Sequence, residues 1–167
     1  MFAKIISTAA ISLTVMASSS VYAQEAAKEL NFGIISTESS QNLKQDWQPV
    51  LDEMSKKLGV KVNGFFASDY AGIIEGMRFG KVHMAWLGNK SAMEAVDRSG
   101  AEVFAHVINT DGSEGYNSLV GVPKDSTLKS VEDVLKNAKT LSFGIGDPNS
   151  TSGFLVPNFY IFAKNKV

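Results

Sequence analysis

The sequence predicts an α/β fold in which a mostly parallel sheet is flanked by helices. Between residues 30 and 108, short apolar runs alternate with longer segments whose apolar residues recur at helical spacing. The short runs are apolar almost throughout, which is typical of strands that are buried on both faces of a parallel sheet. Strict alternation of strand and helix also favours parallel strands, because each helix then serves as a right-handed crossover between two strands.

The first part of the predicted fold contains strands at residues 30–36, 60–67, 82–87 and 103–108, with a helix in each interval. The first helix has one apolar face, made of Leu43, Trp47, Val50, Leu51, Met54 and Leu58. Gly59 follows it, at the position where a left-handed cap belongs. Pro49 interrupts the pattern, so this helix either starts close to the proline or bends there.

The second and third helices have clearer limits. Asp69 is a capping residue for a helix at residues 70–79, and Gly80 closes it. Its expected inward residues are Ile73, Ile74 and Met77. The third helix spans residues 91–99 and ends at Gly100. Its expected inward residues are Ala92, Met93 and Val96.

The alternation breaks at residues 109–115, a cluster of loop-forming residues. Beyond it we expect a strand at 116–122, a helix that starts at the capping box of Ser130 and Asp133, and a strand at 141–145. A loop at 146–153 follows, and the chain looks helical from Phe154 apart from Pro157.

Composition excludes several classes of protein. The 167 residues carry 16 basic and 17 acidic side chains, so the net charge is −1. A nucleic-acid binder that relies on phosphate neutralisation would be basic. No segment approaches the roughly 20 apolar residues that a membrane span requires. The absence of cysteine excludes disulfides, thiolate zinc sites and cysteine nucleophiles.

Residues 1–23 resemble a secretory signal peptide. Lys4 precedes an apolar run at residues 5–17, and small or aliphatic side chains stand at the −3 and −1 positions before cleavage after Ala23. The alternative is a buried N-terminal helix, but this run has no amphipathic face. Export without cysteine or anchor indicates a Gram-negative periplasm. Residues 24–29 are polar and are expected to form a flexible leader.

The predicted elements divide into two lobes. Residues 30–115 form lobe 1, residues 116–123 form an inter-lobe crossover strand, and residues 124–167 form the beginning of lobe 2. Two helices and one strand cannot bury both faces of a sheet, so lobe 2 is expected to be incomplete and the chain truncated. Alternatively, these elements pack on the first sheet.

The loop at residues 146–153 carries the most chemical information. Ser150, Thr151 and Ser152 place three consecutive hydroxyls between a predicted strand and the start of a helix, where parallel sheets hold ligands. Unpaired amides and the helix dipole favour an anion there, and Gly153 allows a close backbone approach. No Lys or Arg is adjacent, so neutral donors would hold the anion. The plainer alternative is that Ser150 or Ser152 only caps the helix.

Two other classes of function are alternatives to a binding module. A serine hydrolase that uses Ser150 or Ser152 needs a general base within hydrogen-bond reach. The loop is not a Gly-x-Ser-x-Gly motif, and the two histidines, His83 and His106, lie in unrelated predicted strands. A ligand sensor would need a transmembrane anchor or a DNA-binding motif, and neither is visible.

Several segments resemble the periplasmic phosphonate-binding protein family of ABC importers. They are residues 30–34, 69–72, 85–86 and 91–96 and, most specifically, Gly-Asp-Pro-Asn-Ser-Thr-Ser-Gly-Phe-Leu-Val-Pro at residues 146–157. The resemblance implies a type II periplasmic binding protein whose two lobes close over a phosphonate such as 2-aminoethylphosphonate. Relatives bind phosphite, phosphate or similar anions. It also implies delivery of the ligand to an inner-membrane permease, with no enzyme activity, cofactor, metal or nucleic acid.

The resemblance assigns roles to five residues of this sequence. Ser150, Thr151 and Ser152 match the motif that grips the phosphonate, while Tyr70 and Tyr116 match tyrosines whose hydroxyls contact its oxygens. The family's histidine and amine-reading carboxylates have no counterpart here, because they lie further along than residue 167. Leu87 also stands where an aromatic residue is expected, so the pocket wall is expected to differ.

Structural roles remain open for some of these residues. Tyr70 is equally compatible with a half-buried position at a helix start, and Tyr116 with an ordinary strand position. Trp86 and Met93 are expected in the core, and Asp147 is expected to shape the turn before Pro148. For His83 and His106 a structural or surface role is favoured over metal binding, because no second ligand stands at suitable spacing.

Overall fold

A computed structural model describes residues 29–167 of the chain. The predicted signal peptide and the predicted leader up to residue 28 lie outside the described residues. Strand β1 (Glu29–Ile34) begins at the last residue of that leader. Among the described residues, no helix combines the length and the apolar character that a membrane crossing requires.

In the part of the chain that the structure describes, three parallel strands form the sheet, which confirms the predicted strand direction. β1 lies in the middle, with β2 (Lys61–Phe66) on one side and β3 (Met84–Trp86) on the other. Phe32 of β1 pairs with Gly64 of β2 and with Met84 of β3. Because the strands are parallel, their carboxyl ends lie at one edge of the sheet, the edge at which such sheets hold their ligands.

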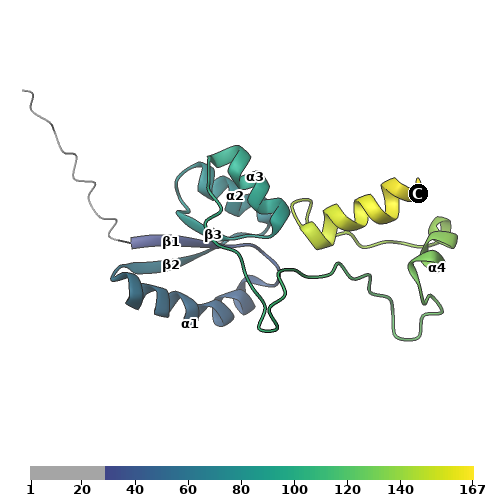
Figure 1. Cartoon of the computed structure of the whole chain (residues 1–167), viewed down its shortest axis with the longest axis horizontal. Coiled ribbons are helices and arrows are strands. Elements are labelled where there is room, and N and C mark those ends of the chain that lie inside the picture. Colours follow the sequence, from purple (N-terminus) through teal and green to yellow (C-terminus); the bar gives the residue numbers. More distant parts are fainter. Residues whose placement is uncertain (1–28) are drawn as a thin grey trace, which may run out of the picture.

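Helices cover both faces of this sheet, as the sequence predicted. α1 (Ser40–Leu58) lies on one face, and α2 (Tyr70–Arg78) and α3 (Asn89–Ser99) lie on the other (Figure 1). α1 connects β1 to β2 and α2 connects β2 to β3, so these two helices serve as crossovers, and α3 follows β3. The fold class is therefore the α/β class expected from the alternation of apolar runs and helical patterns.

Two strand glycines show how closely the layers approach. A Cβ atom on Gly33 would lie 2.7 Å from Cγ2 of Ile73 in α2. A Cβ atom on Gly64 would lie 2.9 Å from Cδ1 of Leu51 in α1. Side chains at these two positions would force the helices away from the sheet, so glycine is required in both strands by packing.

The core lies where α2 meets the sheet. Ile73 and Ile74 are 0% exposed, and Ile35, directly after β1, is 3% exposed. This confirms the predicted inward face of α2 for its two isoleucines. On the other face of the sheet, Leu43 and Leu51 of α1 are buried.

An aromatic cluster lies between α1 and the sheet. The ring of Trp47 in α1 lies 5.7 Å from that of Phe32 and 5.2 Å from that of Trp86, measured between centroids. Trp86 is nevertheless 40% exposed, so the expectation that it is a core residue is wrong. The reason is its place on β3, which is an edge strand of the described sheet.

The predicted helix limits are largely confirmed. The Asp69 side chain caps α2 by accepting a 2.8 Å hydrogen bond from the Gly72 amide. Gly59 and Gly100, which cap α1 and α3, both have φ of 68°. Gly80, one residue beyond the end cap of α2, has φ of 66°. Glycine adopts these left-handed conformations without the cost that a side chain would add.

Pro49 lies inside α1 rather than at its start. The helix begins at Ser40, and the hydroxyl of Ser39 accepts a 3.3 Å hydrogen bond from the Asn42 amide. The alternative in which the proline marks the helix start is therefore wrong. A serine cap and the apolar face that follows it outweigh the loss of one backbone donor at the proline.

The buried face of α3 differs from the prediction. Ser91 and Ala95 are its buried residues, and Arg98, which continues the same helical face, pairs with a glutamate of α2. Small side chains at this face let α3 approach α2 closely. The expectation of an inward face with larger side chains is wrong for Met93 and Val96, which are 65% and 37% exposed.

Three predicted strands are absent from the described residues. The segments at 103–108, 116–122 and 141–145 have no ladder partner, and Phe104 and Leu119 are 82% and 86% exposed. A strand exists only when a neighbour satisfies its amides and carbonyls, and no described segment does so here. These strand expectations are therefore wrong for the described structure.

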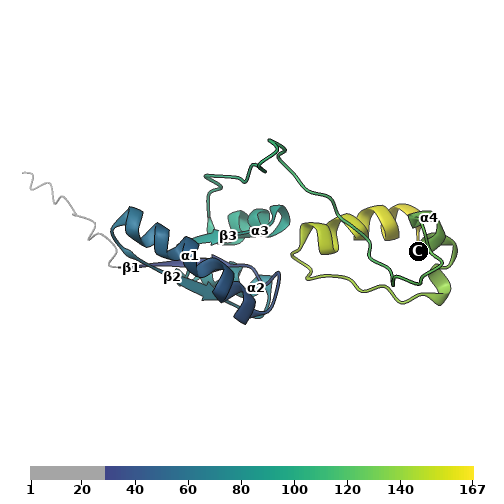
Figure 2. The same cartoon turned by 90° about the horizontal axis from the view of Figure 1, so that it is seen from below.

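The remaining helices lie in the second part of the chain. α4 (Val131–Lys136) begins at the predicted capping box, in which the Ser130 hydroxyl accepts from the Asp133 amide at 3.2 Å. The helical ribbon near the C-terminus begins at Thr151, slightly before the expected Phe154, and extends away from the sheet (Figure 2). The 3₁₀ turn η1 and the π-helical stretches η2 and η3 span Ala138–Thr140, Thr151–Leu155 and Asn158–Ala163.

Candidate functional site

Three helix starts meet at the carboxyl edge of the sheet. α2 begins at Tyr70, after β2, and α3 begins at Asn89, after β3. η2 begins beside α3, as both views of the chain show (Figures 1 and 2). The first amides of a helix have no acceptor within it, so they need partners from elsewhere. The predicted ligand loop at 146–153, which leads into η2, supplies some of those partners.

The loop at 146–153 is closed on itself by backbone hydrogen bonds. The Gly146 amide donates to the Gly153 carbonyl at 2.8 Å. Inside the loop, the Asn149 amide donates to Oδ1 of Asp147 at 2.7 Å, and the Ser150 amide donates to the Asp147 carbonyl at 2.8 Å. The geometry is that of an Asx turn, so the predicted turn-shaping role of Asp147 agrees with its contacts.

Asp147 also ties the loop to α2. Its Oδ2 accepts a 3.1 Å hydrogen bond from the amide of Tyr70, 77 residues earlier in the chain. This contact satisfies one of the unpaired amides at the start of α2 and places the loop against the Tyr70 side chain. Sequence reasoning missed it, because a separation of this length leaves no local signal.

A second contact ties the loop to α3. Oγ1 of Thr151 accepts a 2.9 Å hydrogen bond from the Lys90 amide, in the first turn of that helix. Gly88, the N-cap residue of α3, lies next to this contact: a Cβ built on it would be 3.5 Å from Oγ1 of Thr151 and 3.9 Å from the hydroxyl oxygen of Tyr116. The start of α3 therefore brings Thr151 and Tyr116 to the same place.

The Tyr70 hydroxyl completes the cluster. Burial raises its pKa above the ordinary value, a hydrogen bond with the Ser150 side chain acts in the opposite direction, and the charges of Asp147 and Tyr116 raise it further. The hydroxyl therefore stays protonated at neutral pH and can donate a hydrogen bond. Tyr70 is 8% exposed whereas Tyr116 is 61% exposed, so the cluster has one enclosed and one open side.

Ser150 and Ser152 have different surroundings. The Ser150 hydroxyl accepts a 3.0 Å hydrogen bond from the Gly153 amide, so it caps η2, and capping is compatible with a role toward a ligand. At Ser152 the contact involves the backbone: its carbonyl accepts a 2.7 Å hydrogen bond from Ser118. Sequence reasoning missed Ser118, because its partner stands 34 residues further along the chain and leaves no local signal.

The structure thus brings together four of the five residues that the resemblance singles out. Tyr70, Tyr116, Ser150 and Thr151 lie around the starts of α2 and α3. Ser152 belongs to the same loop, but its placement rests on its backbone contact. The cluster contains hydroxyl groups and backbone amides, which suit the several acceptor oxygens of a tetrahedral oxyanion.

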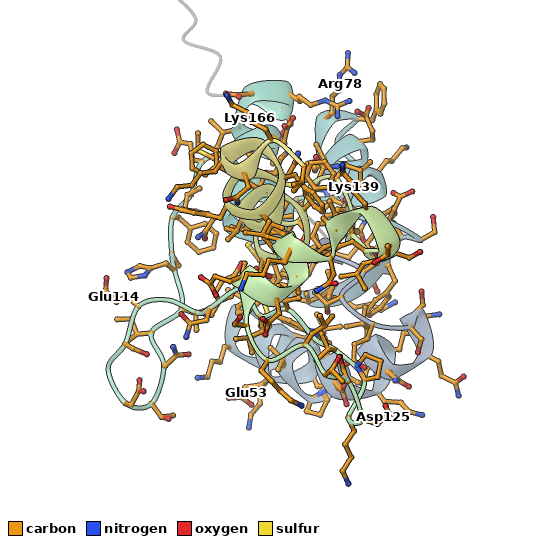
Figure 3. All side chains as sticks on the ribbon, turned by 90° about the vertical axis from the view of Figure 1, so that its right-hand side faces the viewer. Glu53, Arg78, Glu114, Asp125, Lys139 and Lys166 are labelled. Carbon is orange, nitrogen blue, oxygen red and sulfur yellow. The ribbon has the colours of Figure 1, made fainter. Side chains whose placement is uncertain are left out.

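Few full charges face this cluster. Nζ of Lys90 lies 3.1 Å from the Glu94 carboxylate and is therefore paired. Arg78 ends α2, whose nine residues separate it from Tyr70 by roughly 12 Å, and its side chain points outward (Figure 3). Both oxygens of the Asp147 carboxylate accept hydrogen bonds from backbone amides, those of Tyr70 and Asn149. The site is therefore built for neutral donors rather than for ion pairing.

The histidines are not placed to serve a catalytic serine. Nδ1 of His83 accepts a 3.0 Å hydrogen bond from the Asn31 amide, between the two strands, which agrees with the predicted structural role. In the part of the chain that the structure describes, no histidine hydrogen-bonds with Ser150 or Ser152. Residues 29–167 also hold no group of three or more His, Asp or Glu side chains that could bind a metal ion.

The sequence of this chain is similar to those of known proteins. A family model described as the periplasmic substrate-binding protein of phosphonate ABC transporters matches residues 32–167. The phosphonates-binding periplasmic protein of Escherichia coli is 62% identical over 149 residues, which are 89% of this chain and 44% of that protein. The phosphate-import protein PhnD of Mycolicibacterium smegmatis is 33% identical over 132 residues, 77% of this chain and 40% of that protein.

A solved structure supports the same relationship. The binding protein component of a phosphonate ABC transporter from Pseudomonas aeruginosa is 59% identical, with a TM-score of 0.76 over 83% of this chain and 46% of that one. The fold is that of the type II periplasmic binding proteins, as the resemblance implied. The relatives are binding or import proteins, in agreement with the prediction that the chain is not an enzyme. The chain spans about half the length of the relatives it matches.

Proposed function

The chain belongs to the family of periplasmic substrate-binding proteins of phosphonate ABC transporters, and from this premise we propose that it binds a phosphonate at the start of α2, α3 and η2. The observation that carries the proposal is the convergence of hydroxyls from Tyr70, Tyr116, Ser150 and Thr151 at one edge of the sheet. These residues come from three separate segments of the chain. Nothing in the local structure of any one segment requires their hydroxyl groups to lie together.

The chemistry of a phosphonate suits such a cluster. The phosphonyl group is tetrahedral and carries three oxygens that accept hydrogen bonds. Neutral hydroxyl donors satisfy these oxygens, and each hydrogen bond to a charged oxygen is worth about 1.5–3 kcal/mol. Because the side chain of Lys90, whose amide contacts the loop, is paired with Glu94, binding would depend on the number and direction of neutral donors. That dependence favours discrimination between anions and ready release of the ligand.

We propose 2-aminoethylphosphonate as the ligand, with phosphate or phosphite as the alternative. The E. coli relative, at 62% identity, is named for phosphonates. The M. smegmatis relative is named for phosphate import but is only 33% identical. All of these anions contain a tetrahedral phosphorus with at least three acceptor oxygens. The test therefore compares anions that carry an organic group on phosphorus with anions that carry none.

The wider role follows from the family as a second part of the proposal. Residues 30–115 and 124–167 would belong to two lobes joined by residues 116–123, and closure of these lobes would bury the anion. The closed form would deliver the ligand to an inner-membrane permease. Residues 1–23 would direct export to the periplasm and be removed after Ala23.

Calorimetric titration tests the proposal. Two proteins are prepared: the chain from Gln24 to Val167, and a chimera that continues from Val167 with the matching remainder of the E. coli relative. Each is titrated with 2-aminoethylphosphonate, methylphosphonate, phosphite and phosphate. We expect the chimera to prefer the phosphonates and the shorter chain to bind weakly, because Tyr116 is 61% exposed and small-ligand sites need burial.

Three outcomes contradict parts of the proposal. Absence of any binding by the chimera at millimolar phosphonate rejects phosphonate binding, and tighter binding of phosphate than of either phosphonate supports the alternative ligand instead. A submicromolar affinity of the shorter chain would contradict the division into two lobes. As a control, the same titrations with sulfate show whether any tetrahedral anion is accepted.

A further inference from the structure

The backbone conformation of Gly88 does not require glycine. Gly88 is the N-cap residue of α3, with φ of −80° and ψ of 169°. This is an extended conformation that any residue adopts without strain. The glycine at this position therefore differs from Gly59 or Gly100, whose positive φ accounts for the absence of a side chain.

Packing does not require glycine at position 88 either. A Cβ atom there would lie 3.5 Å from Oγ1 of Thr151, 3.7 Å from Oγ of Ser91 and 3.9 Å from the hydroxyl oxygen of Tyr116. These are ordinary van der Waals distances. At Gly33, by contrast, the added atom would lie 2.7 Å from the core residue Ile73, and packing alone accounts for the glycine.

Two hydrogen bonds with the Ser91 hydroxyl fix the backbone of Gly88. Its amide donates to Oγ of Ser91 at 2.9 Å, and the Ser91 hydroxyl donates back to the Gly88 carbonyl at 3.0 Å. Ser91 is 0% exposed, so this support cannot shift without opening the packing of α3. A side chain at position 88 would therefore stay beside the hydroxyls of Thr151 and Tyr116.

We propose that Gly88 is a specificity-determining residue of the phosphonate site: its missing side chain leaves, between the hydroxyls of Thr151 and Tyr116, the space that a phosphonyl oxygen occupies. The inference rests on the proposed function. It assigns a role to a residue with no polar side chain, and it explains why position 88 is a glycine although the surrounding protein atoms leave room for a methyl group. An oxygen held by both hydroxyls would contact a methyl group at position 88.

The test compares Gly88→Ala and Gly88→Ser with the parent protein in the chimera used for the titrations. Both substitutions add a Cβ atom, and serine is in addition a good N-cap residue. Gly144→Ala is the matched control, because a Cβ there meets nothing within 4 Å. For both variants at position 88, we expect the dissociation constants of methylphosphonate and 2-aminoethylphosphonate to rise by about tenfold or more.

The thermal unfolding midpoint of the ligand-free protein is measured for all variants. We expect Gly88→Ser and Gly144→Ala to unfold at the parent temperature. Unchanged phosphonate affinity in both position 88 variants overturns the inference while leaving the proposed function in place. A loss confined to 2-aminoethylphosphonate also overturns it, because the added group would then meet the organic end of the ligand. Failure of the parent chimera to bind any phosphonate rejects the proposed function and this inference together.

Discussion

The amide of Tyr70 and the carboxylate of Asp147 lie 3.1 Å apart and join the start of α2 to the loop at 146–153. The same carboxylate accepts the Asn149 amide through its other oxygen. One side chain therefore shapes the loop and positions it against a helix of the sheet unit. Tyr70 and Ser150, two of the proposed ligand residues, depend on this contact for their relative placement.

Asp147→Asn is expected to weaken this connection. Asparagine keeps one acceptor oxygen, so one of the two amides loses its partner, at a cost to folding of about 1–3 kcal/mol. Removal of the charge also lowers the pKa of Tyr70, because the Asp147 charge raises it. Phosphonate affinity measured against pH should then decline at a lower alkaline pH than in the parent. The control is Asp125→Asn, at an exposed position (Figure 3). If the phosphonate affinity of Asp147→Asn declines at the same alkaline pH as that of the parent, the prediction is wrong.

Substitution of the three hydroxyl residues tests the ligand loop. Ser150→Ala, Thr151→Ala and Ser152→Ala should each weaken phosphonate binding by about 1–3 kcal/mol, if each hydroxyl donates to a charged oxygen. Calorimetry on the chimera measures the change. Thr151→Ser is the control, since it keeps the oxygen that accepts from the Lys90 amide at 2.9 Å. Unchanged affinity in all three alanine variants would place the ligand elsewhere.

Stability at alkaline pH should depend on Tyr70. Its pKa is raised above the ordinary value of 10.0, chiefly by burial, so the folded state keeps the proton longer than the unfolded state. The contribution of the protonated Tyr70 hydroxyl to the free energy of unfolding is fully present below pH 10.0. It is lost as the pH rises through the raised pKa of Tyr70. Urea unfolding at about pH 8 and about pH 11 should show a smaller decline for Tyr70→Phe than for the parent.

The control for this experiment is Tyr160→Phe, because Tyr160 is 57% exposed. Its removal should leave the alkaline decline as it is in the parent protein. An equal decline in the parent and in Tyr70→Phe would show that the protonated Tyr70 hydroxyl does not contribute to folding.

Gly146→Ala should disturb the loop through its closing contact. The added Cβ would lie 3.0 Å from both Cα and the carbonyl oxygen of Gly153, which are backbone atoms and cannot rotate away. We expect a loss of about 1–3 kcal/mol of stability, together with weaker phosphonate binding. Gly144→Ala, where the added atom meets nothing within 4 Å, is the matched control. Equal unfolding midpoints for the two variants would count against a tightly closed loop.

Much of the fold could be predicted because its signals are local. Asp69 caps α2, Ser130 caps α4, and Gly59 and Gly100 end their helices as predicted. Each of these signals involves residues within a few positions of one another, so the sequence contains all of the relevant partners. The parallel sheet followed from the alternation of elements, which limits the possible connections between strands.

The errors concern which side of an element is covered and by what. Met93 and Trp86 are apolar in the sequence but exposed in the structure, because α3 turns its small residues toward α2 and β3 lies at the edge of the described sheet. The segments at 103–108 and 116–122 have strand-like composition, but no described segment pairs with them. An apolar composition indicates that a segment favours burial. It does not show whether another element of the fold packs against that segment.

The sequence by itself determined the helices, the three paired strands with their parallel arrangement, and a hydroxyl-rich loop suited to an oxyanion, because capping, periodicity and donor chemistry are properties of neighbouring residues. Only the tertiary structure decided that Asp147 contacts Tyr70, that Thr151 contacts α3 at the Lys90 amide, and that Gly88 lies beside Thr151 and Tyr116. These contacts join residues that are far apart in the chain, and they depend on the sheet, which brings the starts of α2 and α3 to one edge.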